Sequence, residues 1–210
     1  MYFYPDLSQV EFADRATLDW AEGVEAASRK ILEEAQTLLA ESNDFGPYVK
    51  RNRQRPQGDV HGMLEDASWS TLDLTDKGQP MPERIALAPF AWETITNAAP
   101  LCDIPARAPS LMYSLLRSGS RIPPHTGMIN TRYICHLPLI VPGNGAIRVG
   151  SQTRPWQFGE LLVFDDTIEH EAWNDSSDDR LVLIFDVWRP EISDEERHQI
   201  RALFRAVDAY

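Results

Sequence analysis

The segment that decides the fold is residues 161–188, LLVFDDTIEHEAWNDSSDDRLVLIFDVW. Its three apolar runs, Leu161–Phe164, Ile168–Trp173 and Leu181–Trp188, have the length of strands, and the polar stretch Asn174–Asp179 predicts a turn between the last two. Similar runs occur earlier in the chain, at residues 110–117, 131–141 and 146–149. Several short strands at this spacing are typical of an antiparallel sandwich or barrel.

Helices are predicted on both sides of this β-rich region. From Thr17 to Glu41 apolar residues recur mainly at intervals of three, four and seven, which predicts one amphipathic helix. Residues 80–109 contain six prolines and predict loops and turns around a helix near Trp92. The pattern Ser-Asp-Glu-Glu at 193–196 is a capping box for a last helix. We therefore expect a single domain with three parts: a helical and loop cover at 1–109, a β core at 110–192 and a C-terminal helix at 193–210.

The chain is acidic. Its 210 residues include 32 Asp and Glu against 20 Lys and Arg, which gives a formal net charge of -12. This charge repels phosphate backbones and anionic lipid, so we expect no binding to nucleic acid or to a membrane surface. The local basic stretch Lys50–Arg55 predicts a solvated loop, with an anion-binding segment as the alternative.

Cysteine usage and hydrophobicity bear on the compartment. Cys102 and Cys135 are the two cysteines, too few for a disulfide framework, and they favour a reducing compartment. The first residues have no apolar run of the signal-peptide kind, and no run approaches the roughly 20 apolar residues that span a bilayer. We expect a cytoplasmic protein; the sequence gives no indication of its oligomeric state.

Three residues point to a particular chemistry. His125 lies in PPHTG (123–127), His170 follows 45 positions later, and Arg180 comes ten residues after that. Two prolines stiffen the backbone before His125, and Gly127 lets a ligand approach closely. Neutral imidazole binds Fe(II), Zn or Cu, and a guanidinium can hold a carboxylate through two parallel hydrogen bonds. The trio could hold a metal and an anionic organic cosubstrate side by side.

Each of these residues also has a structural interpretation. His125 could be an ordinary loop histidine and His170 a hydrogen-bonded core histidine, while Arg180 could form a salt bridge with Asp166, Asp179 or another carboxylate. The carboxylate that often follows the first histidine by two positions in non-haem Fe(II) sites is missing, because position 127 is Gly. Residue chemistry alone leaves both interpretations open.

Strand alternation adds a clue about the interior. If residues 164–172 are extended, Asp166 and His170 point to the same face, and in the run 131–141 Arg132 and His136 share a face as well. An interior lined by these four side chains is too polar for a plain core, because buried charge without partners costs several kcal/mol. Such an interior implies a bound ligand, metal or water.

The stretch from Ser114 to Glu191 resembles the aspartyl/asparaginyl β-hydroxylase family of Fe(II)- and 2-oxoglutarate-dependent oxygenases. The region around Trp69 is similar more weakly. The landmarks, in family order and spacing, are PHTG at 124–127, NTR at 130–132, HL at 136–137, FDD at 164–166, EHE at 169–171, Trp173, RL at 180–181 and DVWRPE at 186–191.

The resemblance implies a mainly β fold with flanking helices and a double-stranded β-helix core of the jelly-roll or cupin kind. It implies Fe(II) on His125 and His170, with Gly127 as a family mark and Asp166 holding a water of the metal. It further implies that Ser114 and Arg180 bind the distal carboxylate of 2-oxoglutarate. The carboxylate next to the keto group would contact His136, and O2 would be the oxidant.

This chain departs from the family at one position. An arginine is usual two residues before the histidine at 136, and here that residue is Ile134. Arg132 is the candidate that compensates at the cosubstrate or binds a carboxylate of the substrate. Other candidates for the substrate end are Trp69, for which a core position is the alternative, and the pair Arg53 and Arg55 of the basic stretch.

The activity implied is hydroxylation of an unactivated C–H bond in an amino-acid-like small molecule or a peptide side chain. A lipid substrate is disfavoured by the acidic charge and by the missing membrane segment. Two alternatives belong to other classes: a cupin-like metalloenzyme that needs no 2-oxoglutarate, and a non-catalytic jelly-roll binding domain. The arginine ten residues after His170, with Ser114 available, argues against the first of them.

Overall fold

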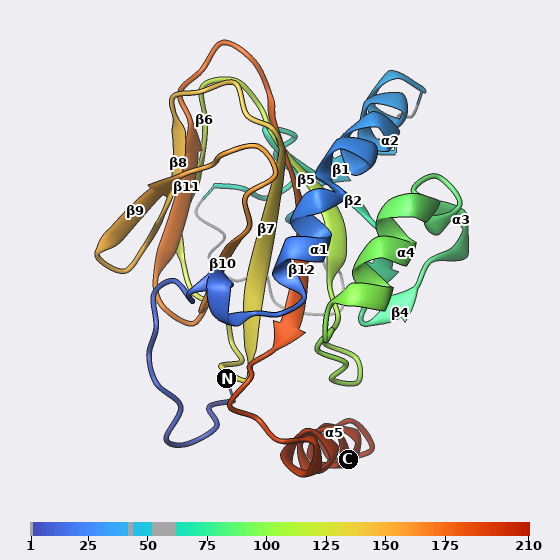
Figure 1. Ribbon diagram of the computed structural model, residues 1–210, viewed down its shortest axis with the longest axis vertical. Coiled ribbons are helices and arrows are strands. Elements are labelled where there is room, and N and C mark those ends of the chain that lie inside the picture. The colour runs from blue at the N-terminus through green and yellow to red at the C-terminus, as the bar shows by residue number, and fades with distance from the viewer. Residues whose placement is uncertain (1, 42–43, 52–61) are drawn as a thin grey trace.

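Two antiparallel β-sheets form the centre of the protein, with helices packed on the outer side of the larger one (Figure 1). The computed structural model describes residues 2–41, 44–51 and 62–210. In spatial order the larger sheet consists of β1 (Gly46–Pro47), β2 (Trp69–Asp73), β5 (Leu111–Leu116), β12 (Arg180–Trp188), β7 (Arg132–Ile140) and β10 (Leu162–Phe164). The smaller sheet consists of β6 (Ser120–His125), β11 (His170–Asn174), β8 (Gly145–Val149) and β9 (Gln152–Pro155). This confirms the mainly β, double-stranded β-helix core.

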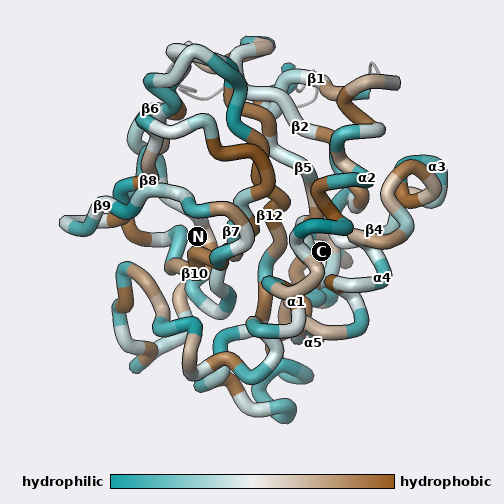
Figure 2. Tube along the Cα trace, turned by 45° about the horizontal axis from the view of Figure 1, so that its top comes forward, coloured by the Kyte–Doolittle hydropathy of each residue, from teal (hydrophilic) through white to brown (hydrophobic). Residues whose placement is uncertain are grey.

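The strands of the larger sheet sort their side chains by alternation. On β7 the residues Tyr133, Cys135 and Leu137 pack into the core beneath the helices, while Ile134 joins the apolar cluster between the sheets. His136 lies on the same side as Ile134 and lines the cavity there. In Figure 2 the hydrophobic residues gather along the central strands around β12. The predicted shared face of Arg132 and His136 is confirmed, since both line that cavity.

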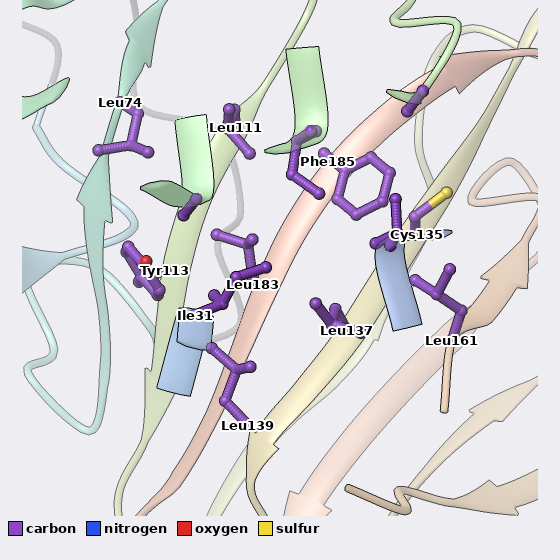
Figure 3. Packing of buried hydrophobic residues seen from close by; sticks show 14 of the residues in the cluster. Ile31, Leu74, Leu111, Tyr113, Cys135, Leu137, Leu139, Leu161, Leu183 and Phe185 are labelled. Atoms are coloured by element: carbon purple, nitrogen blue, oxygen red, sulfur yellow. The ribbon is translucent and has the colours of Figure 1, made fainter. Parts of the chain in front are cut away.

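The helical layer covers the outer face of the larger sheet. It contains the 3-10 turn η1 (Arg15–Thr17), α1 (Ala21–Ala26), α2 (Ser28–Glu41), α3 (Pro82–Ile85) and α4 (Pro89–Ala98). Figure 3 shows Ile31 of α2 packed beside Tyr113, Leu139 and Leu183 of the sheet. The single helix predicted from 17 to 41 is in fact η1, α1 and α2, with Ala27 between the two α-helices.

The packing of α4 onto α2 also satisfies backbone donors. Glu34 of α2 accepts hydrogen bonds from the N–H groups of Phe90 and Ala91 at 2.8 and 2.9 Å. The first N–H groups of a helix have no partner inside the helix, so this carboxylate serves as a cap from outside. The contact fixes the two helices relative to each other.

The C-terminal helix follows the sequence prediction. In α5 (Asp194–Asp208) the side chain of Ser193 accepts from the Glu196 N–H, and the Glu196 carboxylate accepts from the Ser193 N–H at 2.7 Å. Ile200 and Phe204 are buried in a third apolar cluster with Cys102 and Ile104. Figure 1 shows α5 at the bottom of the molecule, away from the other helices.

Two parts of the β structure differ from the prediction. β1 and β2 belong to the larger sheet, so the β core begins before residue 110, and the small hairpin of β3 (Thr75–Asp76) with β4 (Gln79–Pro80) lies in the predicted cover as well. The segment before His125 is the strand β6, although it contains Pro123 and Pro124. Proline is tolerated there because β6 is an edge strand, where an N–H need not donate to a neighbour.

The predicted turn between the second and third apolar runs is present. Asn174 ends β11, and its amide Nδ2 donates to the carbonyls of Leu116, Arg117 and Asp178. The turn leads from the smaller sheet into the larger one, because β11 and β12 lie in different sheets. Asn174 and Arg180 are the two ends of this connection, and His170 at the start of β11 lines the same cavity as Arg180.

Candidate active site

A cavity of about 330 Å³ lies between the two sheets. Every predicted site residue that the structure describes lines this cavity: Trp69, Ser114, His125, Arg132, His136, Asp166, His170 and Arg180. Ile134 lines it as well. Arg53 and Arg55 lie outside the described residues. The two sheets thus bring together residues that lie more than a hundred positions apart in the sequence, as Trp69 and Arg180 do.

His125 and His170 are neighbours on adjacent antiparallel strands, β6 and β11, at paired positions. Their ring centroids are 4.1 Å apart. The Nδ1 of His125 lies 2.7 Å from the Pro123 carbonyl oxygen, and the Nδ1 of His170 lies 3.0 Å from that of Ile168. A carbonyl only accepts, so each Nδ1 carries a proton, and in the neutral form of each ring the free lone pair is then on Nε2. This is the state in which a histidine pair binds a metal ion.

The protonation of His170 suits that role. Burial, and after it the neighbouring His125, lower the pKa of His170 to about 4. The imidazole is therefore neutral near pH 7, as metal binding requires. No group of three or more His, Cys, Asp or Glu side chains within the described parts of the chain is arranged to hold a metal ion.

The carboxylate of Asp166 occupies the space beside Gly127. An added Cβ at position 127 would lie 2.1 Å from Asp166 Oδ2, and the Gly127 N–H donates to the Asp166 carbonyl at 2.6 Å. Oδ2 lies 3.2 Å from Arg132 Nη2, while Oδ1 is buried without a hydrogen-bond partner in the described structure. Asp166 thus fills the place where a side chain of residue 127 would project, and it has a free acceptor there.

This close approach predicts the effect of Gly127→Ala. The new methyl group must displace the Asp166 carboxylate, so we expect a loss of about 1–3 kcal/mol in the free energy of unfolding. We also expect weaker binding of Fe(II), or of Mn(II) as its oxygen-stable substitute. Denaturant unfolding and metal titration of the purified variant measure the two effects.

Gly23→Ala is the matched control. Gly23 lies on the exposed side of α1, and an added Cβ meets nothing within 4 Å. Alanine favours a helix over glycine by about 0.5–1 kcal/mol, so this variant should be slightly more stable and should bind metal normally. If Gly127→Ala had the same stability and metal affinity as Gly23→Ala, the close contact between Gly127 and Asp166 would not matter for the site.

Arg180 is a buried cation without a counter-charge in the described structure. Its side chain is 2% exposed, and its Nε and Nη2 atoms have no hydrogen-bond partner. The predicted alternative, a salt bridge with Asp166, Asp179 or another carboxylate, is not found among the described residues: Asp166 contacts Arg132, and Asp179 pairs with Arg117 at 2.6 Å. Burial lowers the pKa of Arg180 to about 9. An anion bound in the cavity would relieve this cost.

Ser114 and His136 complete a set of donors with Arg180. Ser114 accepts a hydrogen bond from Trp69 Nε1 at 3.1 Å, which leaves its own hydroxyl hydrogen free to donate. Burial, followed by the charges of Arg180 and His170, holds the pKa of His136 well below its usual value. His136 is therefore neutral and carries one N–H donor. Trp69 is both a core residue and a wall of the cavity, in contact with Ser114.

Arg132 has a different environment from the one expected of a ligand-binding arginine. Its guanidinium contacts the carboxylates of Asp186 and Asp166, so two negative charges already oppose it. Asp186 is fully buried and also accepts the Ser110 N–H at 2.6 Å. Ile134, two residues on, is an apolar wall of the cavity. These contacts make Arg132 a residue that orients Asp166.

Three residues that line the cavity, two of them exposed, were missed by the sequence reasoning. Tyr48 is 43% exposed and stacks on Trp69 with ring centroids 4.1 Å apart. Met128 is 63% exposed, and Arg107 pairs with Asp208 of α5 at 2.7 Å. All three line the cavity. Nothing in the local sequence distinguishes them, because their place depends on how β1, α5 and the loop after β6 come together.

Residues 25–190 match the family described as aspartyl/asparaginyl beta-hydroxylase. This chain belongs to that family. The match covers both sheets from β1 to β12, and with them every cavity residue that the sequence singled out and the structure describes. The matched residues therefore include the part of the chain that forms the candidate site.

Curated members of the family show what the chain is similar to. It is 34% identical over 142 residues to the mouse aspartyl/asparaginyl beta-hydroxylase, which is 67% of this chain and 19% of that protein. It is 31% identical over 190 residues to the ornithine lipid ester-linked acyl 2-hydroxylase of Rhizobium tropici, 89% of this chain and 63% of that protein. The chain thus spans about a fifth of the mouse protein and less than two thirds of the Rhizobium one.

Among solved structures, a predicted oxalate decarboxylase from Thermotoga maritima is 15% identical with a TM-score of 0.37, and the match covers 58% of this chain and 81% of that one. This likeness is too weak to bear on function. In the part of the chain that the structure describes, no helix has the length and apolar character needed to cross a membrane.

Proposed function

We propose that the protein is an Fe(II)- and 2-oxoglutarate-dependent dioxygenase that hydroxylates an unactivated C–H bond of an amino-acid-like small molecule or a peptide side chain. The observation that carries the proposal is the uncompensated guanidinium of Arg180 in the same cavity as His125 and His170. A dicarboxylate that reaches from this cation to a metal on the histidines would satisfy both. Membership in a hydroxylase family supports the proposal.

The residues present fit the metal. His125 and His170 would hold Fe(II) through Nε2, and the carbonyls of Pro123 and Ile168 keep both rings in the required tautomer and orientation. Asp166 would accept a hydrogen bond from a metal-bound water through Oδ1, which has no other partner within the described residues. Fe(II) with 2-oxoglutarate and O2 would supply the oxidising power for hydroxylation.

The cosubstrate would be bound by Ser114, His136 and Arg180, each with a donor available towards the cavity. Arg132 was expected to help there, or to bind a substrate carboxylate. Its two carboxylate contacts argue for orienting Asp166 instead. The apolar walls, including Ile134 and Phe164, exclude water, which strengthens the charge interactions of a bound anion.

The names of two relatives indicate the substrates to be tested. One relative is named for aspartyl and asparaginyl residues and another for the acyl chain of an ornithine lipid. The panel to be tested therefore contains free amino acids, short peptides and acyl-ornithines. A cytoplasmic location remains a prediction; the two cysteines are free and buried, as a reducing compartment allows.

The test is aerobic incubation of the protein with Fe(II), 2-oxoglutarate and this panel, followed by mass spectrometry. We expect one product that has gained one oxygen atom, with succinate formed in equal amount. An oxidised product without succinate would show a metalloenzyme that does not need 2-oxoglutarate. If the folded protein bound neither Fe(II) nor 2-oxoglutarate, it would be a non-catalytic binding domain.

A further inference from the structure

Trp156 contacts two of the three residues that we assign to 2-oxoglutarate. It follows β9 directly and is 3% exposed. Its indole Nε1 lies 3.4 Å from Nδ1 of His136, and its ring lies 4.7 Å from the guanidinium carbon of Arg180. Trp156 does not itself line the cavity. One rigid side chain behind the site therefore touches both the imidazole and the guanidinium.

The contact with His136 determines where the imidazole carries its proton. An indole N–H is only a donor, and a neutral imidazole has one donor and one acceptor. Because Trp156 donates to Nδ1, the proton of His136 must be on Nε2. His136 lines the cavity, so the remaining N–H is the one available to an anion there. The opposite tautomer would place two N–H groups against each other.

The contact with Arg180 holds the cation without neutralising it. An aromatic face attracts a guanidinium by cation–π interaction, and the attraction is stronger where water is excluded. A carboxylate in the same place would bind Arg180 more strongly and would compete with an anionic ligand. The ring of Trp156 thus orients the guanidinium while its charge stays available.

We propose that Trp156 is a positioning residue of the anion site: it fixes the Nε2–H tautomer of His136 and supports the unpaired guanidinium of Arg180. The identity of the anion as 2-oxoglutarate rests on the function proposed above. The two contacts themselves do not, so the proposal can be tested with and without the cosubstrate.

The tautomer is tested directly in the wild-type protein. Long-range ¹H–¹⁵N correlation spectra of ¹⁵N-histidine-labelled protein distinguish a protonated Nε2 from a protonated Nδ1. We expect His136 as the Nε2–H tautomer in the wild type and a mixture of both in Trp156→Phe, which keeps a ring but loses the N–H. A wild-type His136 protonated on Nδ1 would overturn the proposal without any variant.

Binding of 2-oxoglutarate tests the consequence. Under anaerobic conditions with Mn(II), calorimetry should give a Kd about tenfold higher for Trp156→Phe, as expected for one lost hydrogen bond. Trp156→Leu removes the aromatic face as well, and its Kd should rise on the order of a hundredfold. In turnover the KM for 2-oxoglutarate should rise, while kcat at saturation should stay within about threefold of the wild type.

Trp188→Phe is the matched control. Trp188 is also 3% exposed, donates its Nε1 to Asp103 at 2.9 Å and has the guanidinium of Arg201 over its ring at 5.3 Å, in the cluster beside α5. Its loss should lower stability without changing the Kd for 2-oxoglutarate. Equal Kd increases in both variants, or an unchanged Kd and tautomer in folded Trp156→Phe, would overturn the proposal. If no variant or wild type binds 2-oxoglutarate while the tautomer depends on Trp156, the proposed function fails and the positioning role stands.

Discussion

Replacing His170 with alanine is expected to abolish 2-oxoglutarate turnover while leaving the fold intact. The metal would keep only His125 as a protein ligand, because no other histidine or carboxylate in the described structure completes a metal cluster. The loss to the fold is small, since His170 gives up one hydrogen bond to a neighbouring carbonyl, worth about 1 kcal/mol. Succinate formation and thermal unfolding of the same preparation measure the two effects.

His198→Ala is the control for this substitution. His198 lies exposed on α5, outside the cavity, and its replacement should leave turnover and stability as they are. A His170→Ala variant that still formed succinate at the wild-type rate would remove His170 from the site. A variant that lost both turnover and folding would call for His170→Gln, which keeps more of the side-chain volume.

Arg180→Met is expected to weaken the binding of 2-oxoglutarate without lowering the stability of the free protein. The Kd for 2-oxoglutarate should rise on the order of a hundredfold or more, because truncating one member of a buried charge pair costs about 2–5 kcal/mol of binding. The free protein should be as stable as the wild type or more stable, since methionine has similar length and removes a buried cation that has no counter-charge within the described residues. Calorimetry and denaturant unfolding test the two parts.

Arg117→Met is the corresponding control. Arg117 forms an exposed ion pair with Asp179, and such pairs contribute about 0–1 kcal/mol. This variant should bind 2-oxoglutarate normally and lose little stability. If Arg180→Met were strongly destabilised without ligand, Arg180 would have a structural partner and the argument for an anion site would fail.

The fold could be predicted largely because its core strands alternate or run apolar between clear turns. The capping box at Ser193 and the strands on either side of Asn174 are local patterns, and the structure confirms them. β6 could not be predicted, because the prolines at 123 and 124 argue against a strand unless its position at the sheet edge is known. The role of β2 in the larger sheet depends on pairing with β5, forty residues later.

The candidate site was predictable where residue type and spacing, together with the family resemblance, indicate a chemistry. His125, His170 and Arg180 were found in this way, and all three line the cavity. Arg132 shows the limit, because its carboxylate partners come from β12 and from the loop after β10. Trp156 could not have been found at all, since tryptophans are common in cores and only the fold places this one against His136 and Arg180.

The two histidines and the donor set near Arg180 are proposed to bind Fe(II) and 2-oxoglutarate together, and the proposed function depends on this joint binding. Anaerobic titration of the protein with both, followed by visible absorption spectroscopy, tests this claim most directly. A weak charge-transfer band should appear when both are present, and it should be absent with either alone and in His170→Ala. Folded wild-type protein that shows no such band with both at saturation would contradict the account.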